Sequence, residues 1–164
     1  MGVDDGRLPL GQPRERDVSG FNNPLFRFSV NFHGAPALSL QEFANYRQDV
    51  IIGASVQVSA PLGQYDKDKL VNLGNNRWFV KPDIGISKAW GALVLELSTG
   101  VTFFSKNDDY FGGKTRKQDP IYSTQGHVIY SFGRGIWTAL NATYYWGGRT
   151  TIDGVTGDTR LGNY

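Results

Sequence analysis

The chain has 164 residues, of which 21 are glycine and 22 are aromatic (10 Phe, 4 Trp, 8 Tyr), and it contains no cysteine. The absence of cysteine excludes a disulfide-held scaffold and a thiolate-bound metal or iron–sulfur site, and the 40% hydrophobic content argues against disorder. A net charge of +2 gives no overall attraction to nucleic acid, so we expect no nucleic-acid partner.

Charged side chains are unevenly distributed along the chain. Four segments with 61 residues in all contain a single charge, Glu96, although charged residues make up 20% of the sequence. These segments alternate polar and apolar residues with a period of two and are rich in Val, Ile, Thr, Tyr and Phe, which is typical of β-strands. The segments are 50–65, 89–105, 120–133 and 135–148.

Taken in chain order, the alternation predicts at least six strands. The first strand places Phe26 and Phe28 on one face and Arg27 and Ser29 on the other, and the later strands repeat this pattern with Ser, Thr, Asn, Gln and Gly on the polar face. A short helix is predicted near residues 38–47, where Ser39 and Glu42 have the spacing of a capping box, and it would lie across a barrel end or in an interface. The six strands are predicted at about 25–33, 50–60, 77–88, 92–104, 120–132 and 136–146.

The connections also alternate, between tight turns and long polar loops. Residues 89–91 and 133–135 are tight turns, whereas 61–76, 105–119 and 147–164 are long and polar, which predicts an up-and-down meander. The motifs YFGG at 110–113 and YWGG at 145–148 lie 35 residues apart, which is the length of two strands, a turn and a loop. We therefore expect both aromatic pairs at the same rim of the sheet.

Two architectures explain this pattern. An outer-membrane β-barrel has strands of about 9 to 11 residues, an apolar outer face, a polar lumen, aromatic girdles and alternating short and long connections. A soluble β-sandwich would carry many Lys, Glu, Asp and Arg side chains on its outer face, and these are scarce here. The pattern favours an all-β fold in which an antiparallel meander forms part of a transmembrane outer-membrane β-barrel; a soluble β-sheet ligand-binding or interaction domain with an apolar interior remains the alternative.

Four ordered runs of the sequence carry a family resemblance: SVNFHGAPALSLQEFANYRQDVIIGASVQVSAPLGQYD, NLGNNRWFVKPDIGISKAWG, FFSKNDDYFGGKTRKQDPIYSTQGHVIYSF and YYWGGRTTIDG. Through them the chain resembles the transporter-like outer-membrane family named for the meta-pathway of phenol degradation, from about Gly20 to the end. The resemblance implies a β-barrel in the outer membrane of a Gram-negative bacterium that passes small, often aromatic or hydrophobic, molecules. A lipid bilayer and small solutes are the partners it implies, and the oligomeric state is left open.

Two features differ from that family. The start of the chain lacks the apolar core of a signal peptide, so the sequence predicts either a cytosolic protein or a missing N-terminus. The last residues, 160–164, do not form an alternating, aromatic-ended strand, and six strands are fewer than the usual minimum of about eight for a closed barrel. We therefore expect residues 1–164 to form a single domain that is an incomplete barrel, an internal fragment.

The polar faces supply the candidate lumen residues. Their ionisable side chains would either bias passage by charge or pair with one another and hold the lumen together. His33 and His127 share the predicted inward register, but two histidines without a carboxylate partner make a weak metal site, so we expect no metal and no cofactor. The lumen-facing candidates are Arg27, Arg77, Lys81, Asp83, Glu96 and His127.

Other clusters have simpler explanations. Oxygen atoms of Asn107, Asp108 and Asp109 could bind a divalent cation, but the spacing matches no established calcium motif and favours a turn. The aromatic pairs are expected to form a girdle at the membrane interface rather than to stack on a ligand. The girdle candidates are Tyr110, Phe111, Tyr145 and Trp146.

Motifs for catalysis are missing from the sequence. It has no cysteine nucleophile, no Gly-x-Ser-x-Gly elbow, no phosphate-binding glycine loop and no His-Glu-x-x-His, so we do not expect an enzyme. The leading hypothesis is an outer-membrane channel or transporter for small, aromatic or hydrophobic molecules. A structural or adhesion role carried by the long loops is a third possibility.

Overall fold

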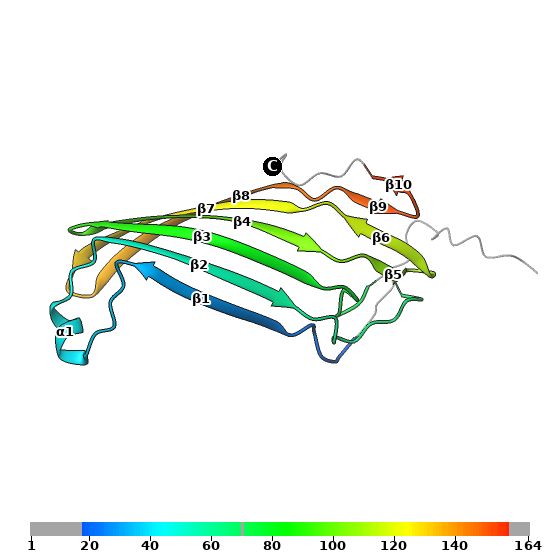
Figure 1. Cartoon of the computed structure of the whole chain (residues 1–164), viewed down its shortest axis with the longest axis horizontal. Helices are drawn as coiled ribbons and strands as arrows, with labels where there is room; N and C mark the ends of the chain where they lie inside the picture. The colour runs from blue at the N-terminus through cyan, green and yellow to red at the C-terminus, as the bar shows by residue number, and fades with distance from the viewer. Residues whose placement is uncertain (1–17, 70, 158–164) are drawn as a thin grey trace, which may run out of the picture.

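The computed structural model describes residues 18–69 and 71–157, and it is almost entirely β-structure (Figure 1). Six long strands form one antiparallel sheet in the order β1-β2-β3-β4-β7-β8, and four short strands form a second sheet in the order β10-β9-β6-β5. The long strands are β1 (Leu25–His33), β2 (Val50–Ser59), β3 (Phe79–Trp90), β4 (Leu93–Phe104), β7 (Ile121–Gly133) and β8 (Ile136–Gly147). The short strands are β5 (Asn107–Tyr110), β6 (Lys114–Gln118), β9 (Thr150–Ile152) and β10 (Val155–Thr156).

The long strands form the predicted antiparallel meander. Each begins and ends within two residues of its predicted range, because the period-two alternation in these segments is nearly continuous. Neighbours in the sheet are also consecutive long strands in the chain, and no long strand crosses over another. The sheet is arched in Figure 1, and within the described residues its first and last strands, β1 and β8, each pair on one side only.

The register separates the sheet into two chemically different faces. Residues opposite each other in neighbouring strands point to the same face. One continuous row consists of small and neutral polar residues: Asn31, Gly53, Gly85, Ser98, Gln125 and Thr143. The adjacent row contains four apolar or aromatic residues and two threonines: Val30, Ala54, Ile84, Thr99, Thr124 and Tyr144.

The second face, which we call the apolar face, is largely uncovered. Phe28 is 68% exposed, Ile84 50%, Leu97 54% and Leu140 71%, and these residues belong to β1, β3, β4 and β8. Among the described residues Ala60 is the single buried hydrophobic side chain, so no apolar core lies within this part of the chain. The sheet therefore exposes the surface that a soluble domain would bury.

Helix α1 (Leu40–Asn45) is the one helix in the described ranges, and it lies within the predicted 38–47. The Ser39 hydroxyl accepts a hydrogen bond from the Glu42 N–H at 3.4 Å, and the Glu42 carboxylate accepts one from the Ser39 N–H at 2.8 Å. These bonds form the predicted capping box, and the hydrogen bonds that the Ser39 N–H and hydroxyl donate to the Glu42 carboxylate lower the pKa of Glu42, the backbone bond contributing most. In Figure 1, α1 lies at the end of the sheet that carries the β3–β4 and β7–β8 turns, which we call the short-turn end.

The prediction that 105–119 and the residues after 147 are loops is wrong for their described parts. The β4–β7 connection is a hairpin of β5 and β6, and β9 pairs with β6, so the second sheet prolongs the first at the opposite end, the long-loop end (Figure 1). Pro120 cannot donate a ladder hydrogen bond, and Gly147 and Gly148 have φ values of 85° and 73°, which explains the break between the two sheets. The short strands are short and mostly polar, so hydrophobic alternation could not reveal them.

No helix in residues 18–69 and 71–157 combines the length and the hydropathy needed to cross a bilayer.

Candidate functional site

Five of the six predicted ionisable residues lie on one face of the sheet, which we call the polar face. Arg27 lies opposite Gln57, which lies opposite Lys81. Asp83 lies two residues beyond Lys81 toward the short-turn end, and therefore on the same face. Glu96 lies opposite His127, two residues from the pair Ser98 and Gln125 in the row of small residues. The structure therefore brings Arg27, Lys81, Asp83, Glu96 and His127 to the same side of the sheet.

Arg27 and Asp83 are joined across β2 by a serine. The Arg27 guanidinium donates to the Ser55 hydroxyl from Nε at 3.1 Å and from Nη2 at 2.9 Å, and Ser55 Oγ donates to Asp83 Oδ2 at 2.7 Å. Arg27 Nη2 also lies 3.6 Å from Asp83 Oδ1. Both charges are thus compensated within three adjacent strands, as expected if paired charges hold the sheet together.

A second polar cluster lies nearer the short-turn end. Gln48 Nε2 donates to Ser87 Oγ at 2.7 Å, and Ser87 Oγ donates to Glu96 Oε1 at 3.2 Å. On the far side of β4, His127 Nδ1 contacts Asn141 Oδ1. Glu96 is held by a neutral hydroxyl, and no described cation lies within ion-pair distance of it.

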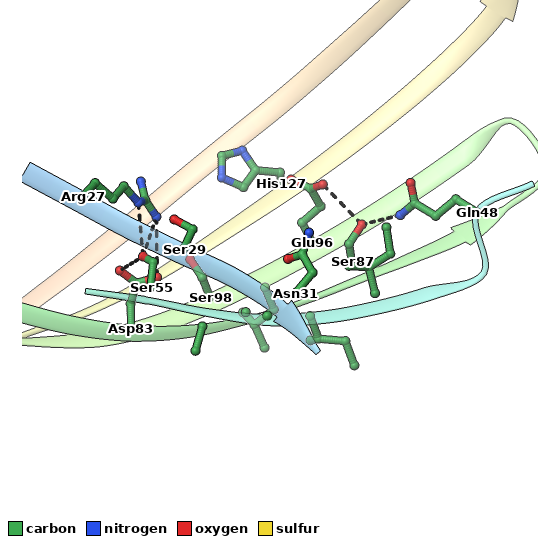
Figure 2. A pocket seen from close by; sticks show the side chains of 16 residues that line it. Arg27, Ser29, Asn31, Gln48, Ser55, Asp83, Ser87, Glu96, Ser98 and His127 are labelled. Atoms are coloured by element: carbon green, nitrogen blue, oxygen red, sulfur yellow. Dashed lines mark hydrogen bonds and ion pairs between the residues drawn. The ribbon is translucent and has the colours of Figure 1, made fainter. Parts of the chain in front are cut away.

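Between the two clusters the polar face is hollow. A cavity of about 390 Å³ is lined by Arg27, Asp83, Glu96 and His127 at its edges and by small residues at its floor. Figure 2 shows the Arg27–Ser55–Asp83 group at one side, the Gln48–Ser87–Glu96 group at the other, and Ser98 between them. The hollow exists because Gly53 and Gly85 carry no side chains in the middle row.

Arg77 lies just outside β3 rather than within it, next to Phe104, which is opposite Phe79 in the register of the polar face, and its role in the lumen stays a prediction. Strand β3 begins at Phe79, and Arg77 lies before it with 9% of its surface exposed and its guanidinium carbon 4.2 Å from the centre of the Phe104 ring. Burial, together with the nearby Arg116, lowers the pKa of Arg77 to about 10. Strand β3 begins only after this segment because Asn76 adopts a φ of 48° and the Trp78 N–H donates to Ser105 Oγ at 3.0 Å.

The two histidines lie in different rows. A bulge between Asn31 and His33 places His33 opposite Ile52, whereas His127 lies opposite Glu96. The shared register that the alternation predicted for them is therefore interrupted. In residues 18–69 and 71–157 no three His, Asp or Glu side chains are grouped so that they could hold a metal ion.

Asn107 and its neighbours form strand β5, and the predicted turn at 107–109 is wrong. The Asn107 side chain is 2% exposed and its Oδ1 accepts hydrogen bonds from Asn76 Nδ2 and from the Asp109 N–H, both at 3.0 Å. Asp108 is paired with Lys106, whose Nζ lies 2.9 Å from Asp108 Oδ2. The Asn107 oxygen thus joins the second sheet to the loop before β3, and Lys106 engages one carboxylate oxygen of Asp108.

The predicted aromatic girdle contains one residue, Tyr145, that lies on the polar face. Tyr145 lies opposite Ser123 on the polar face, whereas Trp146 lies opposite Tyr122 on the apolar face. Successive residues of a strand point to opposite sides, so the pair Tyr145 and Trp146 cannot share one surface. Tyr110 and Phe111 lie at the tip of the β5–β6 hairpin, beyond the long sheet, although at the same long-loop end (Figure 1).

The apolar face carries aromatic residues at both ends, and of these only Trp146 was among the predicted girdle residues. Toward the long-loop end, the Trp146 ring stacks on Tyr122 with centroids 5.5 Å apart and on Tyr144 with centroids 5.7 Å apart. Toward the short-turn end, Tyr130 packs edge-on against Phe132 at 4.9 Å. All of these residues occupy even-numbered positions of β7 and β8, and this shared alternation is the sequence feature that could have identified them. Tyr122 and Tyr130 are eight residues apart in β7, roughly 26 Å at about 3.3 Å per residue.

This arrangement has counterparts among known proteins. The chain matches, over residues 2–163, the model of a family described as "Putative MetA-pathway of phenol degradation". The chain belongs to this family. No match was found among curated proteins.

A solved structure shares both the fold and part of the sequence. The chain is similar to the COG4313 outer membrane channel from Pseudomonas putida F1, with a TM-score of 0.73 and 29% sequence identity over 87% of this chain. The match covers 50% of that channel, so the chain spans about half its length. The six-stranded sheet is accordingly part of a β-barrel of the outer-membrane type, and the structural neighbour is a channel rather than an enzyme.

Proposed function

We propose that this chain forms part of an outer-membrane channel in which the polar face lines the solute pathway and the apolar face contacts lipid. The observation that carries the proposal is the uncovered apolar face, on which large hydrophobic side chains of all the long strands are exposed or half-exposed. Such a continuous apolar surface is stable only when lipid or another protein covers it. The similarity to an outer membrane channel supports lipid as the covering medium.

The aromatic residues of the apolar face support a membrane position. At a strand tilt of about 40°, the roughly 26 Å between Tyr122 and Tyr130 corresponds to about 20 Å along the membrane normal, which is comparable to the apolar band of about 25 Å in outer-membrane barrels. Trp146 and Tyr130 would then mark the two interfaces, and the predicted girdle keeps Trp146 but not Tyr145. Tyr110 and Phe111 would extend beyond the interface at the long-loop end.

The polar face supports passage of small, weakly polar molecules. Its middle row is small and neutral, and its charges lie at the sides of a cavity of about 390 Å³ rather than across it. Arg27 and Asp83 compensate each other, so they stabilise the wall more than they attract ions. The family description names phenol degradation, and small aromatic molecules are therefore the proposed solutes.

The test is solute flux through the full-length protein. Purified protein is reconstituted in liposomes, and swelling is measured in benzamide, a neutral aromatic solute, and in a large oligosaccharide. We expect swelling in benzamide to exceed that of empty vesicles and the oligosaccharide to remain excluded. Equal rates with and without protein would contradict the proposal.

The soluble alternative, a β-sheet ligand-binding or interaction domain, requires an apolar interior. The described part of the chain has no such interior, since Ala60 alone is a buried hydrophobic residue there. A monomeric, cooperatively unfolding chain in detergent-free buffer would nevertheless favour that alternative over the channel.

A further inference from the structure

A second and smaller cavity lies on the polar face, nearer the long-loop end. It has a volume of about 160 Å³, and each of the six long strands contributes to its wall. Arg27 and Lys81 lie on one side of it, and Gln125, Thr143 and Tyr145 lie on the other. The cavity therefore combines two cations with neutral hydrogen-bonding groups and one aromatic ring.

The charge of this cavity is positive. Arg27 and Lys81 stand against a single lining carboxylate, Asp83, which leaves one net positive charge. Asp83 already accepts from Ser55 and faces Arg27, whereas Lys81 makes no hydrogen bond or ion pair with any residue that the structure describes. The Lys81 ammonium group is thus the uncompensated charge.

The opposite wall offers hydrogen-bonding capacity that the chain itself does not use. The side chains of Gln125, Thr143 and Tyr145 form no hydrogen bond within the described ranges, although all three line the cavity. An amide and two hydroxyl groups can donate to an anionic oxygen, and a tyrosine ring offers a face to a planar ligand. Lys81 adds the charge that such an oxygen needs.

Gly100 of β4 leaves room for the side chain of Lys81. A methyl group added at Gly100 would lie 3.2 Å from Lys81 Cε and 2.9 Å from Asp83 Cβ, so the glycine leaves the space that the lysine stem occupies. The lysine stem therefore lies over Gly100 on the polar face of the sheet.

We propose that this cavity is a binding site for the carboxylate of small aromatic acids, and that Lys81 makes the pathway prefer such anions over cations. This inference rests on the proposed channel function and names the class of solute that the channel prefers. Lys81 supplies the charge, Gln125 and Thr143 donate hydrogen bonds, and the Tyr145 ring lies beside the aromatic part of the solute.

The experiment measures the reversal potential of the full-length protein in a planar bilayer under a gradient of sodium benzoate. The wild type is expected to be more permeable to benzoate than to sodium. The variant Lys81→Gln is expected to lower the benzoate-to-sodium permeability ratio about fivefold, the effect of removing one unit charge at about 4 Å in water. Lys81→Arg retains the charge and should preserve the ratio.

Lys88→Gln is the matched control, since Lys88 lies on the same strand but in the apolar-face register opposite Val50 and Leu95. It should leave the ratio unchanged. Heat-modifiable gel migration shows whether each variant is folded; if Lys81→Gln does not fold, a wild type that prefers sodium still overturns the inference.

The outcomes separate this inference from the proposed function. If benzamide crosses liposomes but Lys81→Gln has the wild-type ratio, the anion site is refuted and the channel remains. If neither benzamide flux nor conductance exceeds the protein-free control, the proposed function fails and the inference fails with it.

Discussion

Filling the polar-face cavity with one side chain should slow solute passage without unfolding the protein. Gly85 lies in the middle row and lines the cavity of about 390 Å³. A Cβ added there would meet Ser98 Cβ at 3.5 Å, an ordinary contact, whereas at Gly53 it would lie 2.9 Å from the Val30 carbonyl oxygen. Gly85 is therefore the position at which a larger residue fits the backbone.

The size of the effect follows from the added volume. The seven carbons of a phenylalanine side chain displace about four water molecules at about 30 Å³ each, roughly a third of the cavity of about 390 Å³. We expect Gly85→Phe to reduce the rate of swelling in benzamide by about twofold or more. A narrower cavity hinders a solute most when the solute is nearly as large as the space that remains.

Gly126→Phe is the control, because Gly126 is also a strand glycine but lies opposite Leu97 and Ala142 on the apolar face. A Cβ there meets only the Glu96 carbonyl oxygen, at 3.9 Å. Both variants should show the wild-type heat-modifiable band, and Gly126→Phe should keep the wild-type swelling rate. Equal slowing by both substitutions, or no slowing by a folded Gly85→Phe, would refute the assignment of the polar face to the pathway.

Two further predictions concern charge and the β7–β8 turn. Asp83→Asn removes the carboxylate that compensates Arg27 and should raise the benzoate-to-sodium permeability ratio about fivefold, while costing less than about 1 kcal/mol because the pair is partly exposed; a lower ratio in bilayer recordings would contradict this. Arg134 has a φ of 54° before Gly135, so Arg134→Asn should stabilise the hairpin by up to about 1 kcal/mol in urea unfolding in detergent, and an unchanged midpoint would count against strain there.

The long strands could be predicted from sequence because their pattern is a direct consequence of a two-faced sheet. Wherever one face contacts an apolar medium and the other a polar one, residues must alternate, as in β1 from Phe26 to Phe32. The capping box of α1 is equally local, since Ser39 and Glu42 satisfy each other without any distant partner.

The predictions were wrong where hydrogen bonding between strands, rather than the hydrophobic pattern, determines the structure. Strands β5, β6, β9 and β10 are held by backbone hydrogen bonds between polar segments, so their sequences look like loops. The bulge before His33 and the start of β3 at Phe79 rather than at residue 77 depend on register with neighbouring strands, which one sequence does not specify.

The candidate site could be predicted only in part from the sequence. Alternation alone placed Arg27, Lys81, Asp83, Glu96 and His127 on one face. The three-dimensional register was needed to show which of them pair. It was also needed to show that Lys81 has no partner among the described residues. Tyr145 was grouped with Trp146 by motif similarity, although strict alternation already assigns them to opposite faces.

The central claim, that one face of the sheet meets solute and the other meets lipid, is tested most directly by cysteine labelling. The chain contains no cysteine, so single cysteines introduced at Ser98 on the polar face and at Leu97 on the apolar face are unique labels within it. In liposomes containing the full-length protein, a charged water-soluble thiol reagent should modify Ser98→Cys and slow benzamide flux, and should leave Leu97→Cys unmodified. Labelling of Leu97→Cys with protection of Ser98→Cys would contradict the claim.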